Sequence, residues 1–196
     1  HGILGEQTIC GHCVYLTDED RAALADTQTA GVHNPQSNMG NAVGVTDILK
    51  LIGAGVTVGL GTDGFTADLL ESVKTASVLV KHMNQHPSIG FGEVMDMAFV
   101  NNARLADRHF GGTCGVIRPG ARADLIVSDY RPMTRLTGDN LNGHITFGMN
   151  GRNITTTICG GRVLMQDRVL VGVDEDKIAY ECRAPADALW RALGAL

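Results

Sequence analysis

The stretch from Val56 to Gly64 constrains the fold of this chain more than any other. The apolar run 56–60 leads directly into Gly61-Thr62-Asp63-Gly64, and an amphipathic segment follows from about residue 67. This order predicts a strand, a turn and a helix, with Asp63 at the carboxyl end of the strand, where α/β proteins place their functional groups. Taken alone, the pattern also fits a simpler role, in which Asp63 only caps the following helix.

Two earlier segments repeat this strand–helix plan. Residues 8–16 predict an apolar strand followed by a helix over 17–26. Residues 27–33 predict a second strand, which is followed by a polar, Gly-containing loop over 36–41 and a short helix over 47–54. The third strand covers 56–62. Strands that alternate with helices indicate a parallel sheet joined by right-handed crossovers, and therefore an α/β fold.

Each predicted strand carries one polar group at or near its carboxyl end: His12, His33 and Asp63. A single histidine in an apolar strand is most often a hydrogen-bonded core residue. Three polar groups at one structural level favour a shared site, because the carboxyl ends of parallel strands meet at one edge of the sheet.

The pattern changes after this third strand. Residues 67–84 and 92–110 predict two longer helices, and Gly111-Gly112 is the best domain boundary. From Gly115 onward the short β-branched runs predict strands and hairpins, with a loop-rich crossing over 131–151 between them. A C-terminal helical segment begins at Asp174, and Pro185 predicts that it has two pieces. We therefore expect three regions, residues 1–112, 113–173 and 174–196.

Composition excludes some classes of protein. The formal net charge of -5 offers no basic surface for nucleic acid, and no apolar run reaches the roughly 18 residues of a membrane span. The five cysteines are unevenly spaced, which indicates free thiols and a cytoplasmic location rather than a disulfide framework. We expect no nucleic-acid or membrane partner.

Four motifs in order carry a family resemblance. They are Gly11-His12-Cys13-Val14-Tyr15-Leu16-Thr17, His33-Asn34-Pro35-Gln36-Ser37-Asn38, Gly59-Leu60-Gly61-Thr62-Asp63-Gly64 and Gly120-Ala121-Arg122-Ala123-Asp124-Leu125-Ile126-Val127. A closing hairpin, Cys159-Gly160-Gly161-Arg162-Val163-Leu164, follows them. Together they resemble the amidohydrolase superfamily, in the branch of the SsnA-type aminohydrolases, the guanine and S-adenosylhomocysteine deaminases and the triazine chlorohydrolases.

The resemblance implies the last three βα units of a (β/α)8 barrel, followed by part of a small β-sandwich and a C-terminal helix. It implies a hydrolase acting on C–N bonds, and in some members C–Cl bonds, of a heterocyclic small-molecule substrate. Residue by residue, His12 and Asp63 match catalytic positions and Asp63 also matches a metal ligand. His33 and Asn38 match positions that line the substrate pocket. The implied cofactor is one divalent metal, zinc before iron.

These residue types suit that chemistry. A Lewis-acidic metal lowers the pKa of its bound water towards ~7, which makes hydroxide available at neutral pH. A carboxylate beside the metal can receive the proton and pass it to the leaving group, and a histidine opposite can stabilise charge that develops on the attacked ring.

The chain departs from the family pattern in one respect. The family's other metal ligands are an H-x-H pair and a further histidine on earlier barrel strands, and the sequence contains no H-x-H. His1 precedes the first predicted strand and does not match the further histidine. We therefore expect a fragment of a longer enzyme that is inactive and holds no metal by itself. Its strand edges predict a partner, either another copy or the N-terminal half.

A second interpretation remains open, in which the chain is a non-catalytic binding or assembly module derived from an amidohydrolase. A flavodoxin-like nucleotide domain is weaker, because Gly59 to Gly64 lacks the G-x-G-x-x-G spacing.

Overall fold

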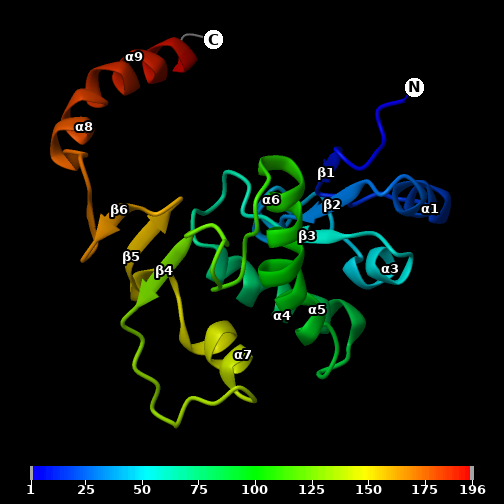
Figure 1. The fold of residues 1–196 in the computed structure, drawn as a ribbon. Helices are drawn as coiled ribbons and strands as arrows, with labels where there is room; N and C mark the ends of the chain where they lie inside the picture. The colour runs from blue at the N-terminus through cyan, green and yellow to red at the C-terminus, as the bar shows by residue number, and fades with distance from the viewer. Residues whose placement is uncertain (1, 195–196) are drawn as a thin grey trace.

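The computed structural model describes residues 2–194, in which a parallel sheet with its helices precedes an antiparallel sheet (Figure 1). The parallel sheet has the order β1-β2-β3. Its strands are β1 (Ile9–Gly11), β2 (Ala30–His33) and β3 (Val58–Leu60). The intervening helices are α1 (Asp18–Asp26), α2 (Pro35–Gly40) and α3 (Ile48–Gly53). The predicted α/β class is confirmed.

Four further helical segments come next along the chain after β3. They are α4 (Leu69–Asn84), α5 (Phe91–Met95), the π-helical turn η1 (Asp96–Asn101) and α6 (Asn102–Phe110). Of these, α4, η1 and α6 contact β3. The cap of α4 is Asp68, whose carboxylate accepts a hydrogen bond from the backbone N–H of Leu70 at 2.9 Å. The role of helix cap considered for Asp63 is therefore wrong, and another explanation is needed for this acid.

Two asparagines at the junction of η1 and α6 pair with the outer edge of β3. The side-chain oxygen of Asn102 accepts from Leu60 N (3.0 Å) and its NH2 donates to Leu60 O (2.8 Å), while Asn101 donates to Val58 O (2.8 Å). An unpaired strand edge exposes backbone donors and acceptors. The asparagine amides satisfy these groups at β3, so this strand is held on both sides as it enters the Asp63 turn.

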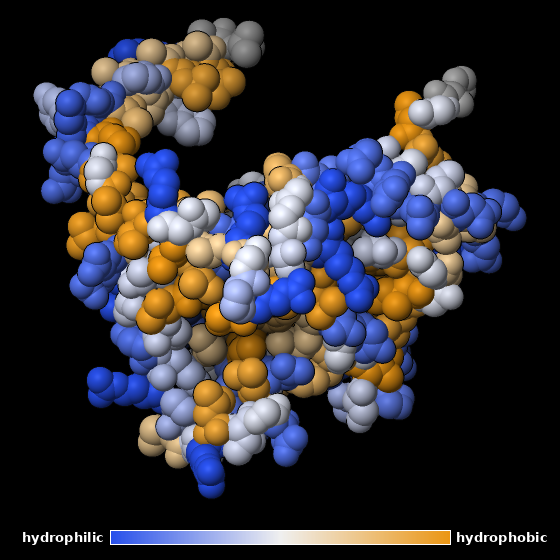
Figure 2. All heavy atoms as spheres, viewed as in Figure 1, coloured by the Kyte–Doolittle hydropathy of each residue, from blue (hydrophilic) through white to orange (hydrophobic). Residues whose placement is uncertain are grey.

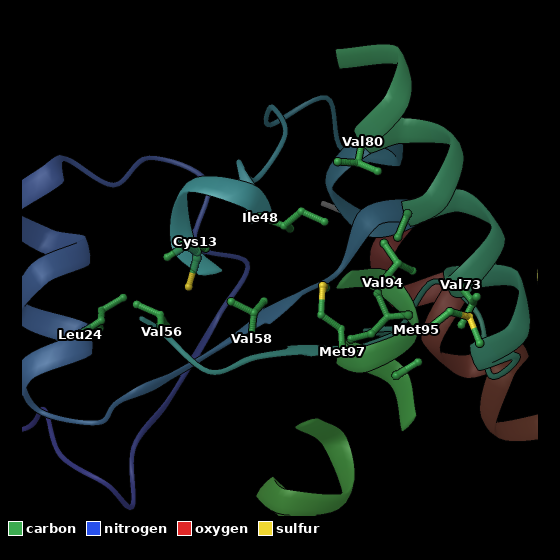
Figure 3. Close-up of a cluster of buried hydrophobic side chains, with 14 residues drawn as sticks. Cys13, Leu24, Ile48, Val56, Val58, Val73, Val80, Val94, Met95 and Met97 are labelled. Carbon is green, nitrogen blue, oxygen red and sulfur yellow. The ribbon is translucent and has the colours of Figure 1, made fainter. Parts of the chain in front are cut away.

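The hydrophobic core lies between the parallel sheet and its helices (Figure 3). Val58 of β3 and Val73 of α4 are fully buried, and Met97 reaches the same cluster from η1. Cys13 belongs to this core as a free thiol, and burial raises its pKa. The core therefore anchors the carboxyl ends of the strands directly.

The second sheet is antiparallel, with the order β4-β5-β6-β7. Its strands are β4 (Leu125–Ser128), β5 (Ile154–Cys159), β6 (Arg162–Gln166) and β7 (Val169–Leu170). Gly160 and Gly161 make the β5–β6 turn with φ of 55° and 80°, which suits glycine in a tight hairpin. The connection from β4 to β5 contains α7 (Leu141–Gly143), η2 (His144–Gly148) and η3 (Gly151–Asn153).

A helical arm follows the second sheet and projects from the rest of the molecule (Figure 1). It consists of α8 (Glu175–Glu181) and α9 (Arg183–Gly194), and every residue from 171 to 194 is exposed. Apolar side chains such as Trp190 lie on its surface, and further apolar patches cover the neighbouring sheet (Figure 2). None of the helices within residues 2–194 is long and apolar enough to cross a membrane.

Several predicted boundaries need correction. The first strand ends at Gly11 rather than at residue 16, because His12 and Cys13 adopt left-handed φ values of 66° and 52°. The segment after Asn34, predicted as a loop, forms α2 with Pro35 in its first turn, where a missing N–H costs nothing. The loop-rich prediction for residues 131–151 missed α7 and η2.

The arm has the two helical pieces that the sequence predicts, but the break lies at Cys182 rather than at proline. Pro185 falls in the first turn of α9, a position that tolerates proline.

Candidate functional site

The parallel register brings the predicted residues to one edge of the sheet. Gly11 lies opposite Val32 and Val32 opposite Gly59, so the three strands end at nearly the same level. His12 directly follows β1, and Asp63 follows β3 after a short Gly-containing turn. Both have left-handed backbone conformations, with φ of 66° and 52°. Such conformations are uncommon outside glycine and cluster at functional sites.

His12 and Asp63 face each other across this edge. The Nε2 atom of His12 lies 3.4 Å from Oδ2 of Asp63, and the two side chains are 44% and 41% exposed. A pair so accessible to water contributes little to stability. The arrangement instead leaves an imidazole nitrogen and a carboxylate open to a small molecule at the end of the sheet.

Hydrogen bonds hold the Asp63 carboxylate in place. Ser37 Oγ donates to Oδ2 at 2.7 Å, and the backbone N–H of Gly64 donates to Oδ1 at 2.7 Å. The Ser37 hydrogen bond, then the Gly64 hydrogen bond and the nearby His12 lower the pKa of Asp63 below its ordinary value. Asn41 in turn donates to Ser37 Oγ at 3.3 Å. The carboxylate is therefore ionised at neutral pH and fixed in orientation.

The His12 ring is held on its other side. Its Nδ1 lies 2.7 Å from Oδ1 of Asn38, whose NH2 donates to Thr46 Oγ1 at 3.3 Å. Thr46 donates to the backbone oxygen of His12. Asn38 is fully buried and Thr46 is 3% exposed, so this support is shielded from water.

His33, the last residue of β2, is buried. Its side chain is 2% exposed, and burial lowers its pKa to about 4, so the imidazole is neutral. Its Nδ1 atom has no hydrogen-bond partner among the described residues. It lines a cavity of about 110 Å³, together with Thr46 and with residues of α4 that include Leu79 and Met83. The assignment of His33 to substrate binding stays a prediction.

Two residues that the sequence interpretation did not select contribute to this site, Ser37 and Thr46. Ser37 lies in the same polar segment as Asn38, and its position one residue earlier on α2 directs it to Asp63. A search for hydroxyl groups beside the predicted residues could have found it. Thr46 offered no such signal, because its contact with His12 spans 34 residues of chain.

The described residues supply only part of a metal site. Across residues 2–194, no three His, Cys, Asp or Glu side chains are grouped so that they could hold a metal ion. Catalytic zinc sites use three protein ligands and one open position. Asp63 can provide one carboxylate ligand, so the residues present do not fit a complete metal centre.

The fold and the site define a class of α/β protein whose candidate functional groups stand at the carboxyl ends of parallel strands. The model of the Amidohydrolase family matches residues 1–164. The chain belongs to the amidohydrolase family, and the resemblance inferred from the four motifs is confirmed.

Similar proteins include deaminases and a chlorohydrolase. A 5'-deoxyadenosine deaminase of Methanosarcina acetivorans is 34% identical over 193 residues, which cover 96% of this chain and 44% of that protein. An adenosine deaminase from Xanthomonas campestris with bound zinc has a similar fold, with a TM-score of 0.82 and 23% identity. The match covers 97% of this chain and 44% of that protein. An atrazine chlorohydrolase from Arthrobacter aurescens complexed with zinc also has a similar fold, with a TM-score of 0.69 and 21% identity. The match covers 92% of this chain and 41% of that protein. The chain spans less than half the length of these relatives.

Proposed function

We propose that this chain is the C-terminal part of a metal-dependent aminohydrolase that removes an amino group from a small heterocyclic molecule. The observation that carries the proposal is the His12–Asp63 pair, with Nε2 and Oδ2 3.4 Å apart at the open end of three parallel strands. Deaminases among the similar proteins make adenosine derivatives the first substrates to test. Hydrolysis of a C–Cl bond is the second chemistry to test, because a chlorohydrolase shares the fold.

The two residues are suited to moving protons. Asp63 is ionised and accepts hydrogen bonds at both oxygens, so it can take a proton from an attacking water and pass it to the leaving amine. His12 offers its exposed Nε2 to the same space, where the ring, once it has taken up a proton at Nε2, can stabilise negative charge that develops on the substrate. Asn38 is fully buried and contacts His12, so we propose that it acts through His12, and its predicted place in the substrate pocket stays a prediction.

The proposed cofactor is one divalent metal, with zinc favoured over iron. A bound metal would supply the Lewis acidity that makes water a nucleophile near neutral pH. Asp63 would be one of its ligands, and the others would come from residues outside this chain, since the described residues offer no three-ligand cluster. We therefore expect the isolated chain to hold no catalytic metal and to be inactive.

We also propose the wider architecture that the resemblance implies. The three parallel strands would be the last three βα units of a (β/α)8 barrel within residues 1–112. Residues 113–173 would form part of a β-sandwich, and residues 174–196 a C-terminal helical segment. The apolar surface of the exposed arm supports association with another copy or with the rest of the protein. The five free thiols support a cytoplasmic location.

The test is turnover in a longer protein that contains this chain and the remaining barrel strands. Ammonia release would be measured from 5'-deoxyadenosine, methylthioadenosine and guanine, with chloride release from a chlorotriazine and metal content determined in parallel. Asp63→Asn should lower turnover by at least about a hundredfold while folding is preserved. Asp139→Asn, at an exposed position in the β4–β5 connection, is the matched control and should leave turnover unchanged. More than about a tenth of wild-type turnover in Asp63→Asn would remove Asp63 from the mechanism.

The lack of a three-ligand cluster within residues 2–194 also favours a second candidate, a non-catalytic binding or assembly module. The same preparation separates the two functions. A longer protein that binds no stoichiometric metal and releases neither ammonia nor chloride would support the module. Metal binding together with turnover would support the enzyme.

A further inference from the structure

We propose that Thr46, acting through Asn38, holds the His12 imidazole with its proton on Nδ1 and its Nε2 lone pair toward Asp63. Thr46 would thus be a positioning residue for the candidate site. Its importance for turnover rests on the proposed function. The place of the proton on the ring does not, because it follows from the chemistry of three consecutive hydrogen bonds.

The first step is the hydroxyl of Thr46. Its Oγ1 atom lies within hydrogen-bond distance of the backbone oxygen of His12, and a carbonyl oxygen can only accept. Thr46 therefore donates its single hydroxyl proton to this hydrogen bond. Toward any other neighbour, its oxygen can only accept.

The second step is the orientation of the Asn38 amide. The Asn38 atom 3.3 Å from Thr46 Oγ1 must be a donor, so it is the NH2 group. The amide oxygen is then the atom that faces His12. Rotation of the amide by 180° would set two acceptors against each other at Thr46, and no water reaches Asn38 to compensate, because the side chain is fully buried.

The third step is the imidazole itself. The Asn38 oxygen lies 2.7 Å from Nδ1 of His12, and an amide oxygen can only accept, so Nδ1 must carry a proton. In the neutral ring, Nε2 then has a free lone pair, which points at Asp63 Oδ2 from 3.4 Å. Two acceptors face each other across this gap. Nε2 is therefore the ring atom that is available to take up a proton at the open side of the site.

The three hydrogen bonds join segments that are distant in sequence. His12 follows β1, Asn38 lies on α2, and Thr46 precedes α3. The chain of bonds returns to the His12 backbone, so it fixes the ring relative to its own main chain. A second set of contacts, from Ser37, holds Asp63 independently. One buried hydroxyl thus determines which nitrogen of His12 carries the proton.

The test reads the tautomer directly by long-range ¹H–¹⁵N NMR of the 196-residue chain labelled at histidine, in alkaline buffer where histidine is neutral. His12→Gln identifies the signal among the seven histidines. Thr46→Val removes the hydroxyl with little change of shape, and Thr46→Ser, which keeps the hydroxyl, is the matched control. Thr46→Ala replaces the valine variant if the latter does not fold.

We expect the Nδ1–H form in the wild type and in Thr46→Ser. In Thr46→Val or Thr46→Ala the tautomer ratio should shift at least about fivefold toward Nε2–H, as expected for the loss of about one net hydrogen bond. An Nε2–H ring in the wild type would overturn the proposal without any variant. The proposal would also be overturned if Thr46→Ser showed the same shift of the tautomer ratio as Thr46→Val. It would equally be overturned if Thr46→Val kept the tautomer ratio of the wild type. None of these measurements uses turnover, so failure of the proposed aminohydrolase activity would leave the result intact.

Discussion

Lowering the pH from about 7 to about 5 should weaken folding through the buried imidazole of His33. Burial lowers the pKa of His33 from 6.5 to about 4. In this range the folded state keeps His33 neutral, whereas the unfolded chain takes up a proton and gains stability relative to the folded state. The contribution of neutral His33 to the free energy of unfolding is therefore complete above the unfolded pKa of 6.5 and is lost as the pH falls towards 4. The loss is about 2 kcal/mol at pH 5 and about 3 kcal/mol once both states are protonated.

Urea unfolding at the two pH values measures this difference. The wild type should lose about 2 kcal/mol more than His33→Gln between about pH 7 and about pH 5, because glutamine does not titrate. His82→Gln, at an exposed position near the end of α4, is the control and should behave like the wild type. An equal loss in the wild type and in His33→Gln would show that the imidazole is not held neutral by burial.

Three further predictions concern the support of the site. Ser37→Ala should raise the pKa of Asp63, because the serine hydrogen bond is the main cause of its low value; a carbon-detected NMR titration measures the shift, and no change would contradict the assignment. Ionised Asp63 stabilises the folded state above its unfolded pKa, and this stabilisation is lost as the pH falls through its lower folded pKa. Because Ser37→Ala brings the two pKa values closer together, the stabilisation should be smaller in this variant. Asn102→Ala should cost about 1–3 kcal/mol in urea unfolding, since both backbone groups of Leu60 lose a partner; a cost below about 0.5 kcal/mol would show that water replaces the amide. Leu51→Ala, at a position 1% exposed, should cost about 2–5 kcal/mol in the same assay, and a smaller cost would indicate a loosely packed core.

The local patterns were most informative where short-range chemistry decides the structure. The helix predicted over 17–26 is α1, with Thr17 as its N-terminal cap, and the alternation of strands and helices correctly predicted a parallel sheet. They failed where local and distant effects compete. The polar segment after Asn34 reads as a loop, but Pro35 suits a first helical turn and burial of Ser37 and Asn38 stabilises α2. Pro185 predicted a break that falls three residues earlier, because the first turn of a helix accepts proline.

The sequence by itself determined the family and placed His12 and Asp63 at the ends of strands, because hydrophobic runs, glycine turns and the spacing of motifs are local properties. Only the tertiary structure decided how these groups are supported. Thr46 reaches His12 across 34 residues, and Ser37 reaches Asp63 across 26. It also decided that His33 is buried and lines a cavity beside α4. The physical reason is that the direction of a side chain at a strand end depends on its φ angle and on neighbours that are distant in sequence, and neither is encoded in the local pattern.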